Sequence, residues 1–346
     1  MTAQCGVTNH SGQQVGEHHQ EGGAKTETLV NKVSRRVMDD EQNLWAARRA
    51  ALAHFIEARG LPEQFSQVFL HWYAGIVTAL AERAMLANAP LLVGLSGCQG
   101  SGKSTLVKAI AHVLEDVHHV NAVVLSLDDF YLTKAERELL ARTVHPLFAT
   151  RGVPGTHDLD LLRQTLSALR TGVPVSLPVF DKAVDDRTDM VQIDQDGASP
   201  QLILLEGWCV GIPPQPDTAL ENPVNDTEAD QDPDRIWRTE VNRALGEEYA
   251  ALFAELDALL VLQAPNFETV FAWRWQQEAQ LSASFRQAYP DAPDPTMTRA
   301  QVSDFILYYQ RLTEHGLKSL PTRADCLWEL AADRSVQRMH LTGVAA

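Results

Sequence analysis

The chain has 346 residues, and 45% of them are hydrophobic, which is enough to bury a sizeable core in one large α/β domain or two modest ones. Its formal net charge of −16 disfavours nucleic-acid binding through a broad basic face, so an anionic ligand would need a local basic pocket. No apolar run approaches the roughly 18 residues that cross a bilayer, and no secretory or transit-peptide pattern is present at the N-terminus. We therefore expect a cytoplasmic protein that binds neither membrane nor nucleic acid.

The first part of the chain predicts a tail followed by helices. Residues 1–40 are rich in Gly, Gln, His, Thr and Ser with few aromatic residues, and this composition predicts a flexible tail. Apolar residues at helical spacing then predict one helix that ends near Gly60 and a second over 63–87. We predict one domain over 41–346, divided into a helical extension (41–90) and an α/β core (91–346).

Within that core, short apolar runs alternate with helical patterns. The predicted strands cover 91–95, 122–127, 202–205 and 258–262, with one or two closing strands inside 325–341. The predicted helices cover 103–115, 159–170, 236–256, 267–288 and 299–315. This alternation predicts a mostly parallel sheet covered by helices on both faces, which is a three-layer α/β sandwich.

One segment departs from this alternation by its composition. Residues 211–234 contain five prolines and seven acidic residues, with no Lys or Arg. Such a segment is typical of a solvated surface insertion, and we expect that state here.

A phosphate-binding motif follows the first predicted strand of the core. It consists of Gly97-Cys98-Gln99-Gly100-Ser101-Gly102-Lys103-Ser104, which matches G-x-x-x-x-G-K-[ST]. Glycines allow backbone N–H groups to converge on phosphates, and the helix after the loop directs its N-terminal donors to the same place. We predict nucleotide contacts from Gly97 through Thr105, with Lys103 reaching the β- and γ-phosphates and Ser104 ligating Mg²⁺. The side chain of Cys98 is expected to face away from the phosphates, which the backbone would hold.

Acidic residues end two further predicted strands on the P-loop side. The second strand ends in Ser126-Leu127-Asp128-Asp129-Phe130-Tyr131, and the third ends in Leu205-Glu206-Gly207-Trp208. A carboxylate at the end of the second strand, where Asp128 and Asp129 stand, can accept a proton from a substrate hydroxyl. Two adjacent acids can also simply begin a helix. An acid after the other strand is the pattern of a Walker B carboxylate that holds Mg²⁺, although acids often follow strands.

These motifs resemble those of D-glycerate 3-kinase of the plant and fungal type. The resemblance also includes Arg151-Gly152-Val153-Pro154-Gly155-Thr156-His157-Asp158, Pro178-Val179-Phe180-Asp181-Lys182 and Trp273-Arg274-Trp275-Gln276-Gln277-Glu278. The wider group contains pantothenate kinase, uridine kinase and phosphoribulokinase. The resemblance implies a P-loop NTPase fold, ATP and Mg²⁺ as cofactors, and a small-molecule acceptor.

The resemblance also implies roles for individual residues. Asp128 corresponds to the base, while Asp129 occupies a variable position. Arg274 lies where the family carries its lid helix and is the candidate to stabilise the transferring phosphoryl group, so the implied catalytic residues are Lys103, Asp128 and Arg274. The implied acceptor pocket contains Asp128, Tyr131, Arg151, His157, Lys182 and Arg187, and the implied metal ligands are Ser104 and Glu206.

The predicted function is phosphorylation of D-glycerate to 3-phosphoglycerate. A pantothenate- or uridine-type kinase and a non-catalytic ATP-binding regulator remain as alternatives. A GTPase switch is disfavoured, because the nearest string to Asn-Lys-x-Asp is Thr133-Lys134-Ala135-Glu136, which differs at both ends. The oligomeric state stays open.

Overall fold

The computed structural model describes residues 41–188, 191–193, 199–290 and 292–342. The chain divides into two compact units, Met1–Ala50 and Ala51–Ala346. In the first unit, residues 41–50 are helical, and the predicted flexible tail over 1–40 lies outside the described residues. The division of 41–346 into a helical extension and an α/β core stays a prediction. The second unit contains every predicted site residue.

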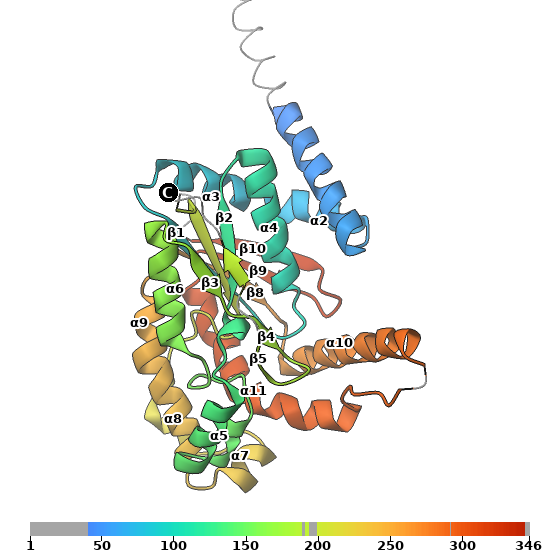
Figure 1. Ribbon diagram of the computed structural model, residues 1–346. Coiled ribbons are helices and arrows are strands. Elements are labelled where there is room, and N and C mark those ends of the chain that lie inside the picture. The colour runs from blue at the N-terminus through green and yellow to red at the C-terminus, as the bar shows by residue number, and fades with distance from the viewer. Residues whose placement is uncertain (1–40, 189–190, 194–198, 291, 343–346) are drawn as a thin grey trace, which may run out of the picture. The chain divides into compact units, whose positions relative to one another are not determined.

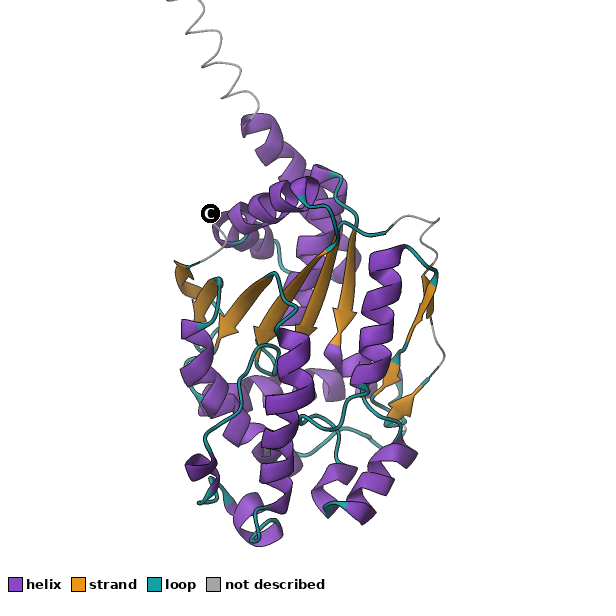
Figure 2. Cartoon of the chain, turned by 90° about the vertical axis from the view of Figure 1, so that its left-hand side faces the viewer, coloured by secondary structure: helices purple, strands orange, loops and turns teal. Residues whose placement is uncertain are grey.

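A six-stranded sheet forms the centre of this unit, in the order β10-β9-β8-β1-β7-β2. Five of its strands are parallel, and β10 joins β9 antiparallel at one edge. Figure 2 shows these strands side by side with helices on both faces, so the predicted mostly parallel α/β sandwich is confirmed. The bounds are β1 (Leu91–Gly97), β2 (Ala122–Ser126), β7 (Leu202–Gly207), β8 (Ala258–Gln263), β9 (Cys326–Leu330) and β10 (Val336–Leu341).

Four shorter strands form two small antiparallel pairs beside the sheet. Strand β3 pairs with β6 and β4 pairs with β5, and the β4–β5 hairpin carries the predicted acceptor residues Lys182 and Arg187. Their bounds are β3 (Val175–Leu177), β4 (Phe180–Asp181), β5 (Asp186–Arg187) and β6 (Val191–Ile193).

The predicted helices are present with two breaks, and helices α5 and α7 were not predicted. The helix expected over 63–87 is two helices that meet at Tyr73, and the one expected over 236–256 contains a π-helical turn at Leu245–Tyr249. Helices α10 and α11 lie side by side and project together from the sheet (Figure 1). The bounds are α2 (Gln64–Trp72), α3 (Ala74–Leu86), α4 (Lys103–His118), α5 (Lys134–Thr143), α6 (Leu159–Thr171), α7 (Asp226–Gln231), α8 (Ile236–Ala244), α9 (Ala250–Phe253), α10 (Phe267–Ala288) and α11 (Arg299–Ser319).

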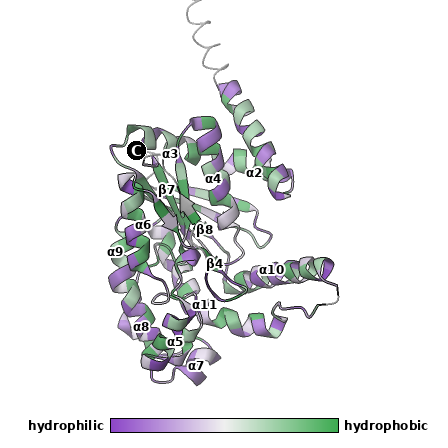
Figure 3. Ribbon diagram, viewed as in Figure 1, coloured by the Kyte–Doolittle hydropathy of each residue, from purple (hydrophilic) through white to green (hydrophobic). Residues whose placement is uncertain are grey.

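The core lies on both faces of the central strands. Every residue of β1 and β7 is buried, as expected for parallel strands that carry helices on each side, and Figure 3 shows the central strands in hydrophobic colours. Helix α4 packs one apolar face against β1, β2 and β7. The P-loop that connects β1 to α4 therefore stands on a rigid support. Among the described residues, no helix is both long enough and apolar enough to cross a membrane.

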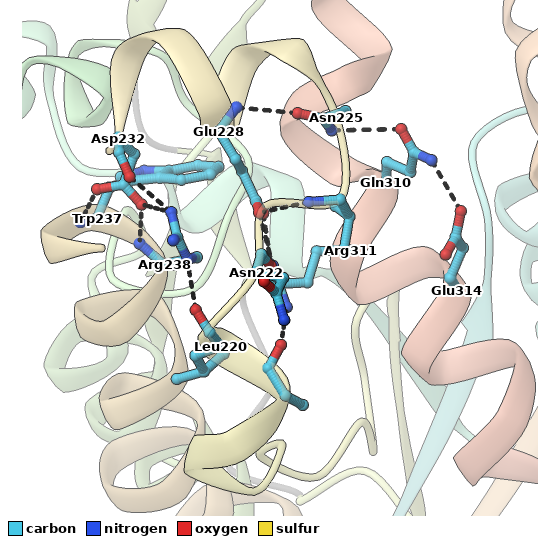
Figure 4. A network of polar contacts seen from close by, with 12 residues as sticks. Leu220, Asn222, Asn225, Glu228, Asp232, Trp237, Arg238, Gln310, Arg311 and Glu314 are labelled. Atoms are coloured by element: carbon cyan, nitrogen blue, oxygen red, sulfur yellow. Dashed lines mark hydrogen bonds and ion pairs between the residues drawn. The ribbon is translucent and has the colours of Figure 1, made fainter. Parts of the chain in front are cut away.

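The acidic segment over 211–234 is solvated only in part, because five of its seven acids are exposed and the other two are buried. Glu228, 1% exposed, forms an ion pair with Arg311 of α11 at 2.6 Å, and Asp232, also 1% exposed, pairs with Arg238 of α8 at 2.9 Å (Figure 4). The prediction is wrong for these two carboxylates because the arginines that neutralise them lie outside the segment. Paired in this way, the segment packs against α8 and α11 as part of the fold.

Candidate active site

The P-loop begins at the end of the middle strand of the parallel part of the sheet. Strand β1 lies between β7 and β8, and Gly102 forms the N-cap of α4 in the left-handed region, with φ of 92°. Gly100 also has a positive φ, of 76°. Glycine adopts this conformation at little cost, so the turn brings the start of α4 and its free N–H groups to the loop. This geometry is that of a phosphate-binding cradle.

Three polar side chains meet Glu206, which is 4% exposed at the end of β7. Its Oε1 accepts hydrogen bonds from the hydroxyls of Ser104 at 2.7 Å and Ser126 at 3.0 Å. Its Oε2 is buried and has no hydrogen-bond partner among the described residues, and the Lys103 ammonium lies 3.8 Å away. A buried carboxylate oxygen with spare acceptor capacity, beside a hydroxyl, is a suitable donor set for Mg²⁺. The structure therefore brings together the two predicted metal ligands.

The thiol of Cys98 belongs to the hydrophobic core rather than to the phosphate side of the loop. The residue is 8% exposed and packs within the main apolar cluster. Burial raises the pKa of the Cys98 thiol to about 11, so the group is neutral. Its orientation agrees with the expectation that the loop binds phosphates through its backbone.

Two residues outside the P-loop motif hold Gly100 in place. A methyl group added at Gly100 would lie 2.6 Å from Cβ of Trp273 in α10, which shows how closely the loop and this helix approach. Arg334, in the turn between β9 and β10, donates from Nε to the carbonyl of Gly100 at 2.5 Å, and its guanidinium lies 5.2 Å from the Trp273 ring centroid. Sequence reasoning missed Arg334, because nothing local to residue 334 indicates a contact with residue 100.

Asp128 lies in a 3₁₀ turn (Leu127–Phe130) that follows β2 directly. Its Oδ1 accepts a hydrogen bond from the Tyr131 hydroxyl at 2.8 Å, and its Oδ2 pairs with the Lys182 ammonium at 2.8 Å. Burial alone would raise the pKa of Asp128, but the positive charges of Lys182 and Lys103 outweigh it and hold the pKa well below its usual value. The carboxylate is therefore ionised and within the electrostatic reach of the P-loop lysine.

The neighbouring Asp129 has a different environment. It accepts a backbone hydrogen bond from Phe180 at 3.3 Å, and burial raises its pKa. This bond joins the turn after β2 to strand β4. The two adjacent acids thus differ in their contacts, and Asp128 is the one held beside cations.

An aromatic group lies next to Asp128. The Tyr131 ring stacks on the His157 ring at 4.6 Å between centroids and 28° between planes, and it meets the edge of Phe180 at 5.1 Å. His157 is 6% exposed, and burial lowers its pKa to about 4. His157 is therefore a neutral imidazole at physiological pH. The predicted pair of Tyr131 and His157 is brought together by these contacts.

The three predicted acceptor cations are all ion-paired in the described structure. Lys182 pairs with Asp128, as given above, and Arg151 pairs with Asp185 and lies 5.3 Å from the Phe180 ring centroid. Arg187 pairs with Asp158 at 3.1 Å and Glu136 at 3.0 Å, while its Nε is buried with no hydrogen-bond partner among the described residues. The structure thus places the three cations around the aromatic group, but each already has an acidic partner that the sequence did not indicate.

Arg274 lies on α10, immediately after the tryptophan that contacts Gly100. Its guanidinium pairs with Glu278 one turn further along at 2.7 Å, and the other oxygen of Glu278 accepts from the backbone N–H of Met297 at 2.6 Å. The Arg274 guanidinium also interacts electrostatically with Tyr309 of α11. The Tyr309 hydroxyl in turn donates a hydrogen bond to the carbonyl of Arg151 at 2.9 Å. The guanidinium of Arg274 is therefore held on the side of the site that carries Tyr309, and its ion-pair partner is a carboxylate within its own motif.

Two aromatic residues that sequence reasoning did not assign support the loop that carries Arg151. Trp208, directly after β7, donates from its indole to the carbonyl of Gly152 at 2.8 Å, and its ring meets Tyr309 edge-on at 5.0 Å. Gly152 has φ of 129°, and a methyl group there would lie 2.1 Å from the Tyr309 hydroxyl. The string containing Trp208 was part of the resemblance, whereas Tyr309 lies in an ordinary helical pattern.

No protein-family model matches the chain. A curated relative, the uncharacterized kinase mug58 of Schizosaccharomyces pombe, is 34% identical over 236 residues, which are 65% of this chain and 83% of the relative. The chloroplastic D-glycerate 3-kinase of Arabidopsis thaliana is 28% identical over 306 residues, which are 81% of this chain and 62% of that relative.

A solved structure supports the same relationship. The D-glycerate 3-kinase of Cryptococcus neoformans superposes with a TM-score of 0.63 and 26% identity, over 78% of this chain and 97% of that one. The fold, the P-loop geometry and these relatives together confirm the kinase resemblance inferred from the motifs. The chain belongs to the P-loop kinase family that mug58 represents, and it is a phosphotransferase enzyme.

Proposed function

We propose that the chain transfers the γ-phosphoryl group of ATP to D-glycerate and forms 3-phosphoglycerate. The observation that carries the proposal is the group of cations around Asp128 and the neighbouring aromatic side chains, because a small acceptor with one carboxylate needs a guanidinium or ammonium to bind it. Two relatives named D-glycerate 3-kinase support the same substrate. The 3-hydroxyl as the reacting group rests on these relatives alone.

The nucleotide side of the proposal assigns roles within and beside the P-loop. Residues 97–105 would hold the phosphates through their backbone N–H groups, and Lys103 would contact the β- and γ-phosphates. Ser104 and Glu206 would hold Mg²⁺, because the unpartnered oxygen of Glu206 is buried beside the Ser104 hydroxyl. When bound, the metal ion would neutralise charge on the phosphates.

On the acceptor side, Asp128 would accept the proton of the attacking hydroxyl. Its carboxylate is ionised, and the hydrogen bond from Tyr131 leaves Oδ2 as the oxygen for this task once Lys182 moves from it. The side chain of Lys182 is 60% exposed, so it can turn toward a substrate carboxylate without disturbing the core. Binding of glycerate would thus exchange one carboxylate partner of Lys182 for another and release the base.

The remaining cations would complete acceptor and transition-state binding. Arg151 and Arg187 would contact the glycerate carboxylate or hydroxyls, and the unpartnered Nε of Arg187 is a donor available for this. Arg274 would stabilise the charge that develops on the transferring phosphoryl group. Positioning and charge stabilisation would supply most of the acceleration, because phosphoryl transfer requires little covalent chemistry from the protein.

A pantothenate-type kinase is the second candidate, because pantothenate also carries a carboxylate that these cations could bind. A uridine-type acceptor fits less well, since the Tyr131 ring already stacks on His157 and is not open to a base. The cytoplasmic location and the roles of individual residues stay predictions.

The test is product analysis by ³¹P and ¹³C NMR after incubation with ATP, Mg²⁺ and each of D-glycerate, pantothenate and uridine. We expect turnover with D-glycerate and a 3-phosphoglycerate product, and none from Lys103→Ala at equal concentration. Formation of 2-phosphoglycerate would contradict the regiochemistry. Turnover of pantothenate or uridine without turnover of glycerate would contradict the proposed acceptor.

A further inference from the structure

The helical stretch after the acidic segment contains a π-helical turn at Leu245–Tyr249, between α8 and α9. Such turns insert one extra residue into a helix and are frequent at functional sites. Here the turn ends at Tyr249, which is 1% exposed and contacts the loop that carries His157. The established fold does not need a hydroxyl at this buried position, since a phenyl ring would fill the same apolar space.

The hydroxyl of Tyr249 has two partners among the described residues. It accepts a hydrogen bond from the backbone N–H of Gly155 at 3.2 Å, and it lies 2.6 Å from Nδ1 of His157. The Tyr249 ring meets the His157 ring edge-on at 5.8 Å between centroids, which is consistent with a contact in the plane of the imidazole. The backbone of Gly155 can only donate, so this bond uses a lone pair of the hydroxyl and leaves its proton for another acceptor.

These contacts select one direction for the short bond. If Nδ1 carried a hydrogen and donated it to the hydroxyl, the hydroxyl proton and the Nε2 lone pair would both be buried with no partner among the described residues. If the hydroxyl donates to Nδ1 instead, both hydrogen bonds are made and only the hydrogen on Nε2 is left without a partner. An unmade buried hydrogen bond costs about 1–3 kcal/mol, so the second arrangement, which leaves one unsatisfied polar group instead of two, is preferred. A neutral imidazole with an accepting Nδ1 carries its hydrogen on Nε2.

The other nitrogen of the ring is then a donor without an acceptor. Nε2 of His157 is buried and has no hydrogen-bond partner among the described residues. The same ring stacks on Tyr131, whose hydroxyl donates to Asp128. A free N–H therefore lies in the aromatic group beside the proposed base.

We propose that Tyr249 is a positioning residue that holds His157 in the Nε2–H tautomer, so that His157 presents a neutral hydrogen-bond donor to an oxygen of the acceptor. The part that concerns the acceptor rests on the proposed function, whereas the tautomer does not. A neutral donor suits this place because an imidazolium would attract the Asp128 carboxylate and weaken it as a base. The class of ligand that the Nε2–H group would recognise is a phosphoryl-acceptor substrate that carries a hydroxyl or carboxylate oxygen near its reacting hydroxyl.

The tautomer is measured directly by long-range ¹H–¹⁵N correlation NMR on the full chain at pH 7.5 without substrate. His157→Gln identifies the signals of His157 by their loss. We expect a hydrogen on Nε2 and a lone pair on Nδ1 in the wild type, and a mixture of tautomers or the Nδ1–H form in Tyr249→Phe. Tyr308→Phe is the matched control, because it removes the hydroxyl of another tyrosine, one that contacts Trp237 instead of His157.

Kinetics then test the role toward the acceptor. Tyr249→Phe should raise the KM for D-glycerate by about 2- to 10-fold, up to the worth of one neutral hydrogen bond, and leave the KM for ATP unchanged. His157→Gln, whose amide N–H can replace Nε2–H, should retain a lower acceptor KM than His157→Asn, which is too short to do so.

An Nδ1–H tautomer in the wild type would overturn the proposal even if Tyr249→Phe does not fold. So would a Tyr249→Phe variant in which both the tautomer and the acceptor KM are those of the wild type. If the wild type shows the Nε2–H tautomer but does not phosphorylate glycerate, the proposed acceptor fails and the tautomer assignment stands.

Discussion

Replacement of Gly100 by alanine tests whether α10 supports the P-loop. The P-loop pattern allows any residue at position 100, but φ there is 76°, and a Cβ would lie 2.6 Å from Cβ and 3.0 Å from the backbone carbon of Trp273. The left-handed conformation costs a non-glycine residue about 1–2 kcal/mol, and overpacking adds about 1–3 kcal/mol, so the free energy of unfolding should fall by about 2–5 kcal/mol. Ordinary carbon–carbon contact requires the loop and helix to separate by about 1 Å.

That displacement should also reduce catalysis. A misplacement of about 1 Å can cost about 10²-fold in rate, and we expect a loss of this order in kcat/KM for ATP. Urea unfolding of the nucleotide-free protein and steady-state kinetics measure the two effects. Gly60→Ala is the matched control, because Gly60 has φ of 60° with no atom within 4 Å of an added Cβ, so it should show only the conformational cost and normal kinetics. If Gly100→Ala behaves like this control in both assays, the contact between Trp273 and the loop does not support the site.

The remaining predictions concern single side chains. Asp128→Asn should lower kcat by about 10²-fold or more, as expected for a lost general base, and Asp129→Asn should lower it less; the reverse order would mean that the other carboxylate is the base. Arg274→Ala should lower kcat more than it raises the KM for ATP, because its charge would act mainly in the transition state, and an effect confined to the KM for ATP would contradict this role. Burial lowers the pKa of His157 from its ordinary 6.5 to about 4 in the folded protein. As the pH drops, the unfolded chain therefore binds the proton before the folded protein does. The free energy of unfolding should fall by about 3 kcal/mol between pH 6.5 and pH 4. Urea unfolding at pH 7.5 and 4.5 should show a smaller loss in His157→Gln, and equal losses would refute this cause.

The sequence predicts best what is encoded over a few neighbouring residues. The apolar run of β1, the glycine-rich loop and the amphipathic pattern of α4 are consecutive in the chain, so the P-loop and its supports are predicted with nearly correct bounds. The position of Glu206 is also local, because an acid directly follows a buried run. Its hydrogen bonds to Ser104 and Ser126 agree with its predicted place in the site.

Contacts between distant residues account for what the sequence did not predict. Tyr309 binds the carbonyl of Arg151 across 158 positions of the chain, and Arg334 binds that of Gly100 across 234 positions. Neither tyrosine nor arginine carries a local pattern that indicates such a partner. The π-helical turn that ends at Tyr249 was missed for a different reason, since one inserted residue hardly changes the helical periodicity of its flanks.

Composition was misleading where charges are neutralised from elsewhere. The seven acids of 211–234 suggested exposure, because the sequence does not show that Arg311 and Arg238 reach two of them. The same holds for Arg151, which was predicted as an acceptor cation without its partner Asp185. Sequence reasoning thus located the charged residues but not their pairing.

The buried ion pairs of the acidic segment also limit how this protein can be shortened by design. Replacing 211–234 with a brief linker would remove Glu228 and Asp232 and leave Arg311 and Arg238 buried without a counter-charge, at a cost of about 3–5 kcal/mol for each broken pair. A minimal version would therefore need apolar residues in place of both arginines at the same time. The helix that carries Arg311 also carries Tyr309. Such a redesign would therefore also disturb the hydrogen bond from the Tyr309 hydroxyl to the carbonyl of Arg151, which lies outside the deleted segment.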